Sequence, residues 1–221
     1  MGTKVEVLRV FTDEHGEFGN ELGVVEAATV RPADRQHLAT ALGFSETVFV
    51  DEPADGSARV QIFTPAVELP FAGHPTVGTA WWLAQRGTPV DALDVAAGRV
   101  LVTNGAVVQV QAHADWAPHF TFHDLVAPAD VDALDPDSFT SGHHYAWAWS
   151  GDGTIRSRMF APDMGIREDE ATGAAAVRMT ARLTRDLTIT QGAGSQIVTS
   201  FDGDGWVRIG GRTVADRVLD V

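Results

Sequence analysis

Hydrophobic and polar residues alternate along several short stretches of this chain, as they do in half-buried β-strands. Glycine, proline, asparagine and aspartate bound most of these stretches and predict turns between the strands. The alternation predicts strands over residues 5–10, 22–26, 47–50, 60–63, 145–149 and 154–160.

Two hairpins are predicted from the residues that join neighbouring strands. Residues 99–111 hold two alternating stretches joined by Asn104-Gly105, a pair typical of tight hairpin turns. The strands at 145–149 and 154–160 are joined by a Gly-Asp-Gly turn at 151–153. Both hairpins predict antiparallel pairing of adjacent strands.

Two helices are predicted in the first half of the chain. One starts at Arg31-Pro32-Ala33-Asp34 and runs to about Leu42, and Gly43 ends it, as glycine commonly does after a helix. The other is opened by Ala72-Gly73-His74-Pro75 and covers the apolar residues 76–83. Proline suits a first helical turn, because the N–H that it lacks has no partner there.

The second half of the chain repeats part of the first. FTP at residues 63–65 and FAP at 160–162 each end a strand, and acidic residues and a small-residue stretch with glycine follow both. In the second copy this stretch opens a helix within REDEATGAAAVRMTARL, residues 167–183. We therefore predict two similar lobes, at 1–112 and 113–221, with the final strand able to return to the first lobe.

The pattern is weaker between residues 112 and 141. Residues 116–124 are typical of a strand, and 128–139 of a short helix or an irregular acidic segment. Neither HExxH nor a comparable ligand spacing occurs, so a metal hydrolase is disfavoured and no metal is expected. The histidines scattered in and near this region are His113, His119, His123, His143 and His144.

Composition narrows the possible functions. The chain has 221 residues, 44% of them hydrophobic, which suffices for a sizeable core. Its formal net charge of -14 disfavours nucleic acid and anionic membranes as partners. It has no cysteine, which excludes disulfides, thiolate nucleophiles and paired-thiol racemisation. The N-terminal residues enter a strand without a signal-peptide core, and no apolar run is long enough for a membrane span, so we expect a cytoplasmic protein.

The two predicted helix starts are candidate anion sites. The first turn of a helix has free N–H groups and the positive end of the helix dipole, and both favour a carboxylate or phosphate. His74 lies at one start, and Glu168-Asp169 lies just before the other. We expect the two starts to face each other across a cleft between the lobes, where ligands commonly bind. Ordinary strand–loop–helix units without chemistry remain the alternative.

Two polar residues precede predicted strands. Glu46 stands just before the strand at 47–50, where partial burial would raise the pKa of its carboxyl group toward useful acid–base chemistry. Asn20 lies in a glycine-containing loop and offers both hydrogen-bond donors and an acceptor. The alternatives are a solvated glutamate at a strand edge and an ordinary turn asparagine.

Four blocks of this sequence together resemble the PhzF family of phenazine-biosynthesis-like proteins. They are GNELGVV, FSETVFV, FTPAVELPFAGHPTVGTA and RMFAPDMGIREDEATGAAA, and their order and spacing also match. The resemblance implies an α+β fold of the diaminopimelate-epimerase type, with two lobes that are each a mostly antiparallel, barrel-like sheet around a central helix. It further implies a homodimer and cofactor-free proton transfer, best known as isomerisation of trans-2,3-dihydro-3-hydroxyanthranilate.

The resemblance also assigns roles to individual residues. Glu46 matches the catalytic acid–base glutamate, and His74 and Asp169 match its substrate-contacting partners in the catalytic site. Gly73 and Gly173 match the glycines that free the backbone N–H groups at the two helix starts. The expected substrate-binding residues are Asn20, Gly73, Pro75, Thr172, Gly173 and Ala174.

The chain departs from the family pattern in its second half. Glu170 stands where the family has proline, and Ala174 where it has a serine that helps to bind substrate. The segment QGAGSQIVTS, residues 191–200, lacks the usual glycine–arginine–proline–serine. The leading hypothesis is a cofactor-independent isomerase of a small carboxylate. The alternative is a silent or weakly active family member that binds a small anion.

Overall fold

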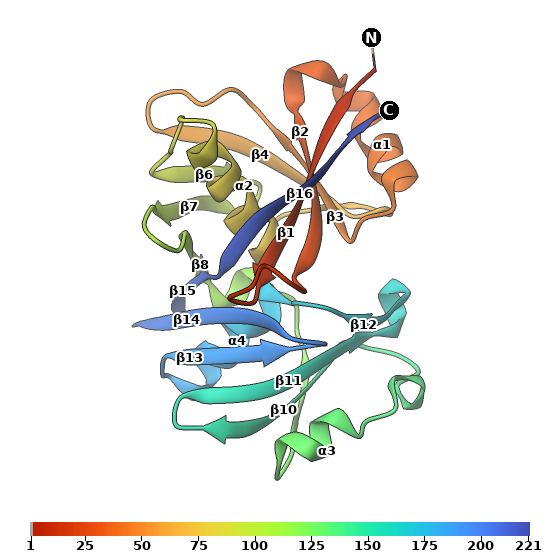
Figure 1. Cartoon of the computed structure of the whole chain (residues 1–221), viewed down its shortest axis with the longest axis vertical. Helices are drawn as coiled ribbons and strands as arrows, with labels where there is room; N and C mark the ends of the chain where they lie inside the picture. The colour runs from red at the N-terminus through yellow and green to blue at the C-terminus, as the bar shows by residue number, and fades with distance from the viewer. Residues whose placement is uncertain (1) are drawn as a thin grey trace.

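The computed structural model describes residues 2–221, which form an α+β fold with one continuous mixed sheet. The sheet bends around two helices, and Figure 1 shows its strands in an upper group around α2 and a lower group around α4. The helices are α1 (Arg35–Leu42), α2 (Gly73–Gln85), α3 (Pro128–Asp132) and α4 (Gly173–Leu183). The strands of the first half are β1 (Lys4–Thr12), β2 (Asn20–Glu26), β3 (Glu46–Val50), β4 (Ser57–Phe63), β5 (Glu68–Leu69), β6 (Ala92–Val95), β7 (Gly98–Thr103) and β8 (Gln109–His113). Those of the second half are β9 (Thr121–Asp124), β10 (His144–Gly151), β11 (Thr154–Ala161), β12 (Ile166–Asp169), β13 (Leu187–Gln191), β14 (Ser195–Gly203), β15 (Trp206–Gly210) and β16 (Arg212–Asp220).

Strand pairing confirms the predicted internal repeat. In the first half β2 pairs parallel with β3, β3 antiparallel with β4, and β4 parallel with β6. The second half repeats this order, because β9 pairs parallel with β10, β10 antiparallel with β11, and β11 parallel with β13. Each half also adds a short antiparallel strand just before its central helix, β5 beside β4 and β12 beside β11.

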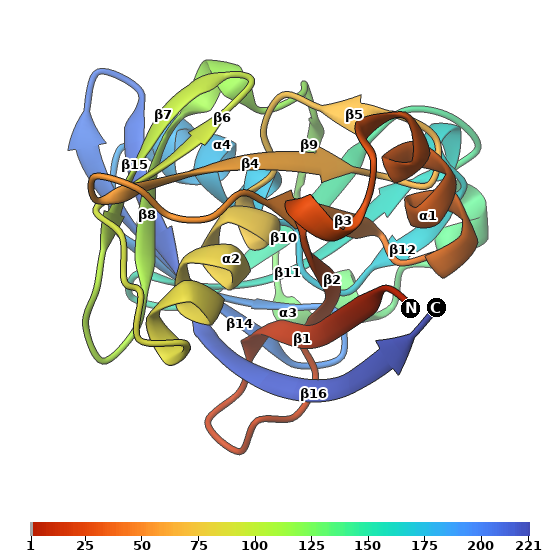
Figure 2. The same ribbon diagram turned by 90° about the horizontal axis from the view of Figure 1, so that it is seen from above.

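The two central helices are buried inside the strands. Helix α2 is apolar or small on every side, and nearly all of its residues from Gly73 to Leu83 are buried. A helix without a polar face is stable only when neighbours cover it all round. It contacts β1, β2, β3 and β8, and Figure 2 shows strands on both sides of it. Helix α4 is amphipathic and packs its buried face, which includes Ala176 and Met179, against β14 and β15.

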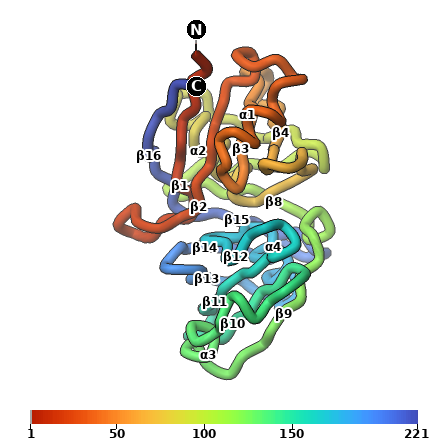
Figure 3. Tube along the Cα trace, turned by 90° about the vertical axis from the view of Figure 1, so that its right-hand side faces the viewer, coloured from red at the N-terminus to blue at the C-terminus, as the bar shows by residue number. Residues whose placement is uncertain are grey.

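The chain ends join the same part of the fold. Strand β16 pairs antiparallel with β1, and Thr3 and Val221 exchange backbone hydrogen bonds of 2.6 and 3.0 Å. Figure 3 shows β16 beside β1 in the upper part, while β9 to β14 form the lower part. The predicted lobe boundary at 112/113 falls at the end of β8, which pairs with β7 and with β15. Among the described residues, no helix is both long and apolar enough to span a membrane.

The structure corrects three local predictions. Asn20 is the first residue of β2 rather than part of the preceding loop, and Asp169 is the last residue of β12 rather than part of an acidic loop. The hairpin of β7 and β8 exists, but the two-residue turn is wrong, because Thr103 pairs with Gln109 across a longer connection. A tight turn of the expected type needs positive φ at both central residues, and Gly105 does not have it.

Candidate active site

The starts of α2 and α4 lie directly against each other. A Cβ atom built on Gly73 would be 2.8 Å from the Cα of Gly173, and one built on Gly173 would be 2.9 Å from the backbone N of His74. Only glycine permits this approach, since real Cβ contacts are not that short. The predicted convergence of the two helix starts is confirmed. They touch, however, and do not face each other across open space.

Glu46 and His74 meet beside this contact. Glu46 is the first residue of β3 and lies opposite Leu22 of β2, while His74 is the second residue of α2. The Oε2 atom of Glu46 and the Nε2 atom of His74 are 3.4 Å apart, with side chains 15% and 5% exposed. Neither atom has a hydrogen-bond partner among the described residues. A buried, unpaired carboxyl oxygen is costly and is characteristic of groups that engage a ligand.

Asp169 is held by several neutral donors. The Nδ2 atom of Asn20 donates to its Oδ1 atom at 2.8 Å and to the carbonyl of Ala171 at 3.1 Å. The hydroxyl of Thr172 donates to the other carboxyl oxygen of Asp169. Asn20 is itself oriented by Ser45, whose Oγ donates to its Oδ1 at 3.0 Å. These bonds link the first half of the chain to the loop before α4.

Burial shifts the pKa of all three ionisable groups. It raises the pKa of Glu46 to about 7, since desolvation penalises the charged carboxylate. It also raises the pKa of Asp169 to about 6, to which the nearby charge of Glu46 adds. Desolvation lowers the pKa of His74 to about 4, although Asp169 opposes this. At neutral pH the imidazole is therefore uncharged, and Glu46 is present in both protonation states.

A cleft of about 660 Å³ opens onto these carboxyl groups. Asn20, Glu46 and Asp169 line it, whereas the helix starts, with His74 among them, are buried beside it. Its rim carries two exposed apolar side chains, Val67 and Met164, which are 54% and 46% exposed. They occupy equivalent positions in the repeat, each four residues after the paired phenylalanines Phe63 and Phe160.

The cleft lining is acidic, and only two of its carboxylates, Glu21 and Glu168, are paired with an arginine among the described residues. Of the described residues that line it none is basic, and its carboxylates are Glu21, Glu46, Asp163, Glu168, Asp169 and Glu170. Glu21 pairs with Arg217 at 2.7 Å, Asp163 accepts from the backbone N–H of Gly142 at 2.7 Å, and Glu170 accepts from Ser195 at 3.0 Å. Glu46 and Asp169 have no arginine partner among the described residues, and they are the two lining carboxylates whose pKa values burial raises to about 7 and about 6.

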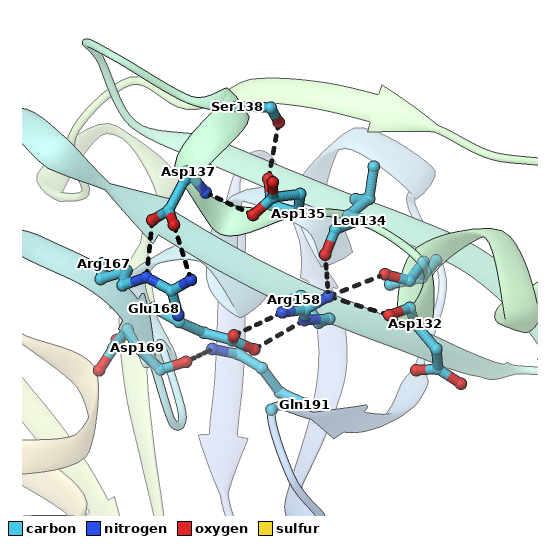
Figure 4. A network of polar contacts seen from close by, with 12 residues as sticks. Asp132, Leu134, Asp135, Asp137, Ser138, Arg158, Arg167, Glu168, Asp169 and Gln191 are labelled. Carbon is cyan, nitrogen blue, oxygen red and sulfur yellow. Dashed lines mark hydrogen bonds and ion pairs between the residues drawn. The ribbon is translucent and has the colours of Figure 1, made fainter.

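Glu168 faces away from its neighbour Asp169. The guanidinium group of Arg158 holds both of its oxygens, at 2.8 and 2.6 Å, and also donates to the carbonyl of Leu134 at 2.7 Å (Figure 4). A bidentate arginine–carboxylate pair is among the stronger polar contacts in proteins. The pairing of Arg158 with Glu168 therefore fixes the position of β12, and Asp169 points to the other side of this strand, toward Glu46.

The sequence-predicted site residues fall into two groups. Glu46, His74, Asp169 and Asn20 gather at one point, with Gly73 and Gly173 next to them. Thr172 contributes its hydroxyl to Asp169, while Pro75 and Ala174 do not line the cleft. Three further residues hold the site residues in place and were not predicted from the sequence: Ser45, Arg158 and Gln191. Ser45 precedes Glu46 in the FSETVFV block, but the contacts of all three depend on distant residues.

No group of three or more histidine, aspartate or glutamate side chains within residues 2–221 is arranged to hold a metal ion. His123 and His144 do come together, with ring nitrogens 3.0 Å apart, but without a carboxylate as third ligand. The absence of a metal and of any other cofactor stays a prediction.

Comparison with protein families identifies the chain. The model of the PhzC-PhzF family, described as phenazine biosynthesis-like protein, matches residues 8–122 and 137–203. The chain belongs to this family. A trans-2,3-dihydro-3-hydroxyanthranilate isomerase from Pseudomonas aeruginosa is 31% identical over 209 residues, covering 76% of this chain and 74% of the relative. The PhzF-family chain is accordingly an isomerase.

Solved structures confirm the fold. A putative phenazine biosynthesis PhzC/PhzF protein from Clostridium difficile superposes with a TM-score of 0.81 at 18% identity, covering 99% of both chains. A probable proline racemase from Agrobacterium radiobacter reaches a TM-score of 0.67 at 12% identity, covering 99% of this chain and 92% of the racemase. The predicted α+β fold of the diaminopimelate-epimerase type is therefore confirmed.

Proposed function

We propose that this protein is a cofactor-independent isomerase that moves a proton on a small carboxylate resembling dihydro-3-hydroxyanthranilate. The main support for this proposal is the pair of atoms Glu46 Oε2 and His74 Nε2, which lie 3.4 Å apart. Both atoms are buried, and neither has a hydrogen-bond partner among the described residues. Such a pair is ready to exchange a proton with a ligand. The named isomerase relative supports the substrate class.

Glu46 carries the proton in this proposal. Its carboxylate takes a proton from one substrate carbon, and the resulting acid returns a proton to another carbon, so no net proton is gained or lost. A group that acts first as base and then as acid works best with a pKa close to the working pH. Burial raises the pKa of Glu46 to about 7, which meets this requirement.

His74 and Asp169 orient the substrate. Since the pKa of His74 is lowered to about 4, its imidazole is neutral and exchanges hydrogen bonds without bringing a positive charge. Asp169 adds a negative charge that suits a substrate ammonium group. The acidic lining of the cleft therefore favours an amino-acid-like zwitterion over a simple anion.

The substrate carboxylate is proposed to bind the backbone N–H groups at the starts of α2 and α4. Helix N-termini attract anions, and the described residues that line the cleft supply no competing basic side chain. Because Gly73 and Gly173 are buried against each other, a carboxylate reaches these groups only when the two helix starts separate slightly. Val67 and Met164, on the rim of the cleft, then contact the carbon ring of the proposed substrate.

The test uses trans-2,3-dihydro-3-hydroxyanthranilate in D₂O, with product formation and deuterium content followed by mass spectrometry and NMR. We expect turnover, with solvent deuterium at the product carbon that receives the proton. Glu46→Gln should bind the compound and not convert it. Equal turnover by this variant and by wild-type protein would contradict the proposed role of Glu46.

The alternative is a family member that binds a small anion without turnover. Two departures from the family pattern favour it. Ala174 stands where the family has a serine that helps to bind substrate, and residues 191–200 lack the arginine that the family has there. Calorimetry of the same compound separates the two hypotheses, because binding without conversion or deuterium exchange identifies a silent member.

The prediction of a homodimer rests on the resemblance and is tested by light scattering after gel filtration.

A further inference from the structure

Gln191 bridges two parts of the loop that carries Asp169. It is the last residue of β13 and is fully buried, at 0% exposure. Its Nε2 atom donates to the backbone carbonyl of Asp169 at 3.1 Å and to the hydroxyl oxygen of Thr172 at 2.8 Å. These two bonds use both hydrogens of the amide.

The orientation of this amide is dictated by its partners. The carbonyl of Asp169 only accepts hydrogen bonds, so the Nε2 side of Gln191 must face it. The hydroxyl of Thr172 then receives a hydrogen from Gln191, and its own single hydrogen is left to point at Asp169 Oδ2. The two bonds form a directed chain from Gln191 through Thr172 to the carboxylate of Asp169.

The other groups that face Asp169 come from three elements. Asn20 of β2 donates to its Oδ1 atom at 2.8 Å, Glu46 of β3 adds a repelling charge, and His74 of α2 is neutral near pH 7. Glu46 faces fewer donors: the hydroxyl of Ser45 is the one hydrogen-bonding group that lowers its pKa, and its Oε2 atom lacks a partner among the described residues. Two adjacent buried carboxyl groups do not both ionise readily, so the donors decide which one keeps the proton.

We propose that Gln191 is a positioning residue: acting through Thr172, it holds Asp169 ionised, so that a proton taken up from the substrate is held on Glu46 and not passed to Asp169. Without the amide, the hydroxyl of Thr172 would be free to turn to the unpaired carbonyl of Asp169. The carboxylate would then lose one of its two side-chain donors, and the proton would spend more time on Asp169. The consequence for catalysis rests on the function proposed above, whereas the ionisation of Asp169 does not.

The direct test is the titration of Asp169 by ¹³C NMR of aspartate-labelled protein, with Asp169→Asn identifying its resonance. Gln191→Met keeps the side-chain volume and removes the donors, so we expect the pKa of Asp169 to rise by about one unit, the scale of a lost hydrogen bond to a charged group. Gln196→Met is the matched control, an exposed glutamine on the adjoining β14 that should leave the titration unchanged.

A double substitution shows whether the effect passes through Thr172. Thr172→Val should raise the pKa of Asp169 by itself, and adding Gln191→Met should then raise it little further. Should Gln191→Met not fold, Gln191→Asn tests the same point, because its shorter side chain cannot reach both acceptors. An unchanged Asp169 titration in a folded Gln191 variant, or full additivity of the two substitutions, would overturn the proposal.

Kinetics separate this proposal from the proposed function. If wild-type protein turns over the substrate, Gln191→Met should move the pH dependence of kcat in step with the shifted titration, which a purely structural role would not do. If wild-type protein is inactive, the NMR titration still decides whether Gln191 controls Asp169. The two hypotheses can therefore fail independently.

Discussion

Gly73 and Gly173 pack face to face, so closely that a Cβ atom on either one would lie within 3 Å of the other's Cα atom. Gly73→Ala should therefore push the starts of α2 and α4 apart. We expect a loss of about 1–3 kcal/mol in the free energy of unfolding, the usual range for overpacking a rigid contact. Urea unfolding followed by tryptophan fluorescence measures it.

The matched control for this substitution is Gly105→Ala. The nearest atom to a Cβ at Gly105 is 3.6 Å away, an ordinary contact, and its φ is not positive. Its stability should change by no more than about 0.5 kcal/mol, as for most surface changes. Equal stability of the two variants would show that the helix starts are not in rigid contact.

Glu46→Gln should lower kcat by at least about a hundredfold, the scale of a lost acid–base group. The amide keeps the shape of the side chain but cannot carry the transferred proton, so the dissociation constant of the substrate should change little. Stopped assays and calorimetry measure the two quantities. Glu14→Gln, at an acid in the β1–β2 loop whose side chain is 81% exposed, is the control and should keep wild-type kcat.

Glu46 should also make the protein less stable as the pH rises. Its pKa is raised from 4.5 to about 7, so between these values the folded state binds more protons than the unfolded state. The contribution of Glu46 to the free energy of unfolding is fully present below pH 4.5. It is lost as the pH rises toward 7, and the total loss is roughly 3 kcal/mol. Glu46→Gln, which has no charge to bury, should gain stability relative to wild-type protein across this interval.

Wild-type protein has to be compared with Glu46→Gln, because His74 changes the stability with pH in the direction opposite to Glu46. Its pKa is lowered from 6.5 to about 4, so its contribution to stability grows as the pH rises through that range. The two effects partly cancel in the wild-type curve. Urea unfolding of both proteins from pH 4.5 to 8 measures the contribution of Glu46 together with the rise that its charge causes in the pKa of Asp169. Parallel curves would mean that the carboxyl group of Glu46 is not desolvated.

Val67 and Met164 should control the affinity for the substrate ring. Val67→Thr and Met164→Gln retain size but make the cleft rim polar, so we expect each to raise KM several-fold with little change in kcat. The affinity for 3-hydroxyanthranilate is compared with the affinity for acetate. Acetate has no ring, so its affinity should not change in the rim variants. Val126→Thr, at a valine that is 95% exposed, is the control. An unchanged KM in both rim variants would remove them from the substrate site.

The local pattern of the chain determined most of its elements. Alternating residues predicted β1, β4, β10 and β11, because burial of one face of a strand leaves a period of two in the sequence. The apolar, small-residue stretches after glycine predicted α2 and α4. The repeat of Phe63 and Phe160 predicted the two similar halves. The turn at Asn104-Gly105 could not be settled in this way, because its conformation depends on where the side chain of Asn104 binds, the carbonyl of Val90.

The residues that form the candidate site were identified from the sequence blocks, but their relations were not. Glu46, His74 and Asp169 come from three separate elements, and only the packing of α2 against α4 brings them together. Their pKa values are set by desolvation, which depends on everything that covers them and not on neighbours along the chain.

The supporting residues were decided by tertiary structure alone. Each of them contacts a side chain that is more than ten residues away or carried by another strand: Ser45 contacts Asn20, Arg158 contacts Glu168, and Gln191 contacts Thr172. The sequence determined which residue types were available at the two helix starts. Only the folded chain decided that Asp169 would be surrounded by donors, while the Oε2 atom of Glu46 has no hydrogen-bond partner among the described residues, since hydrogen-bond geometry exists only after distant segments have met.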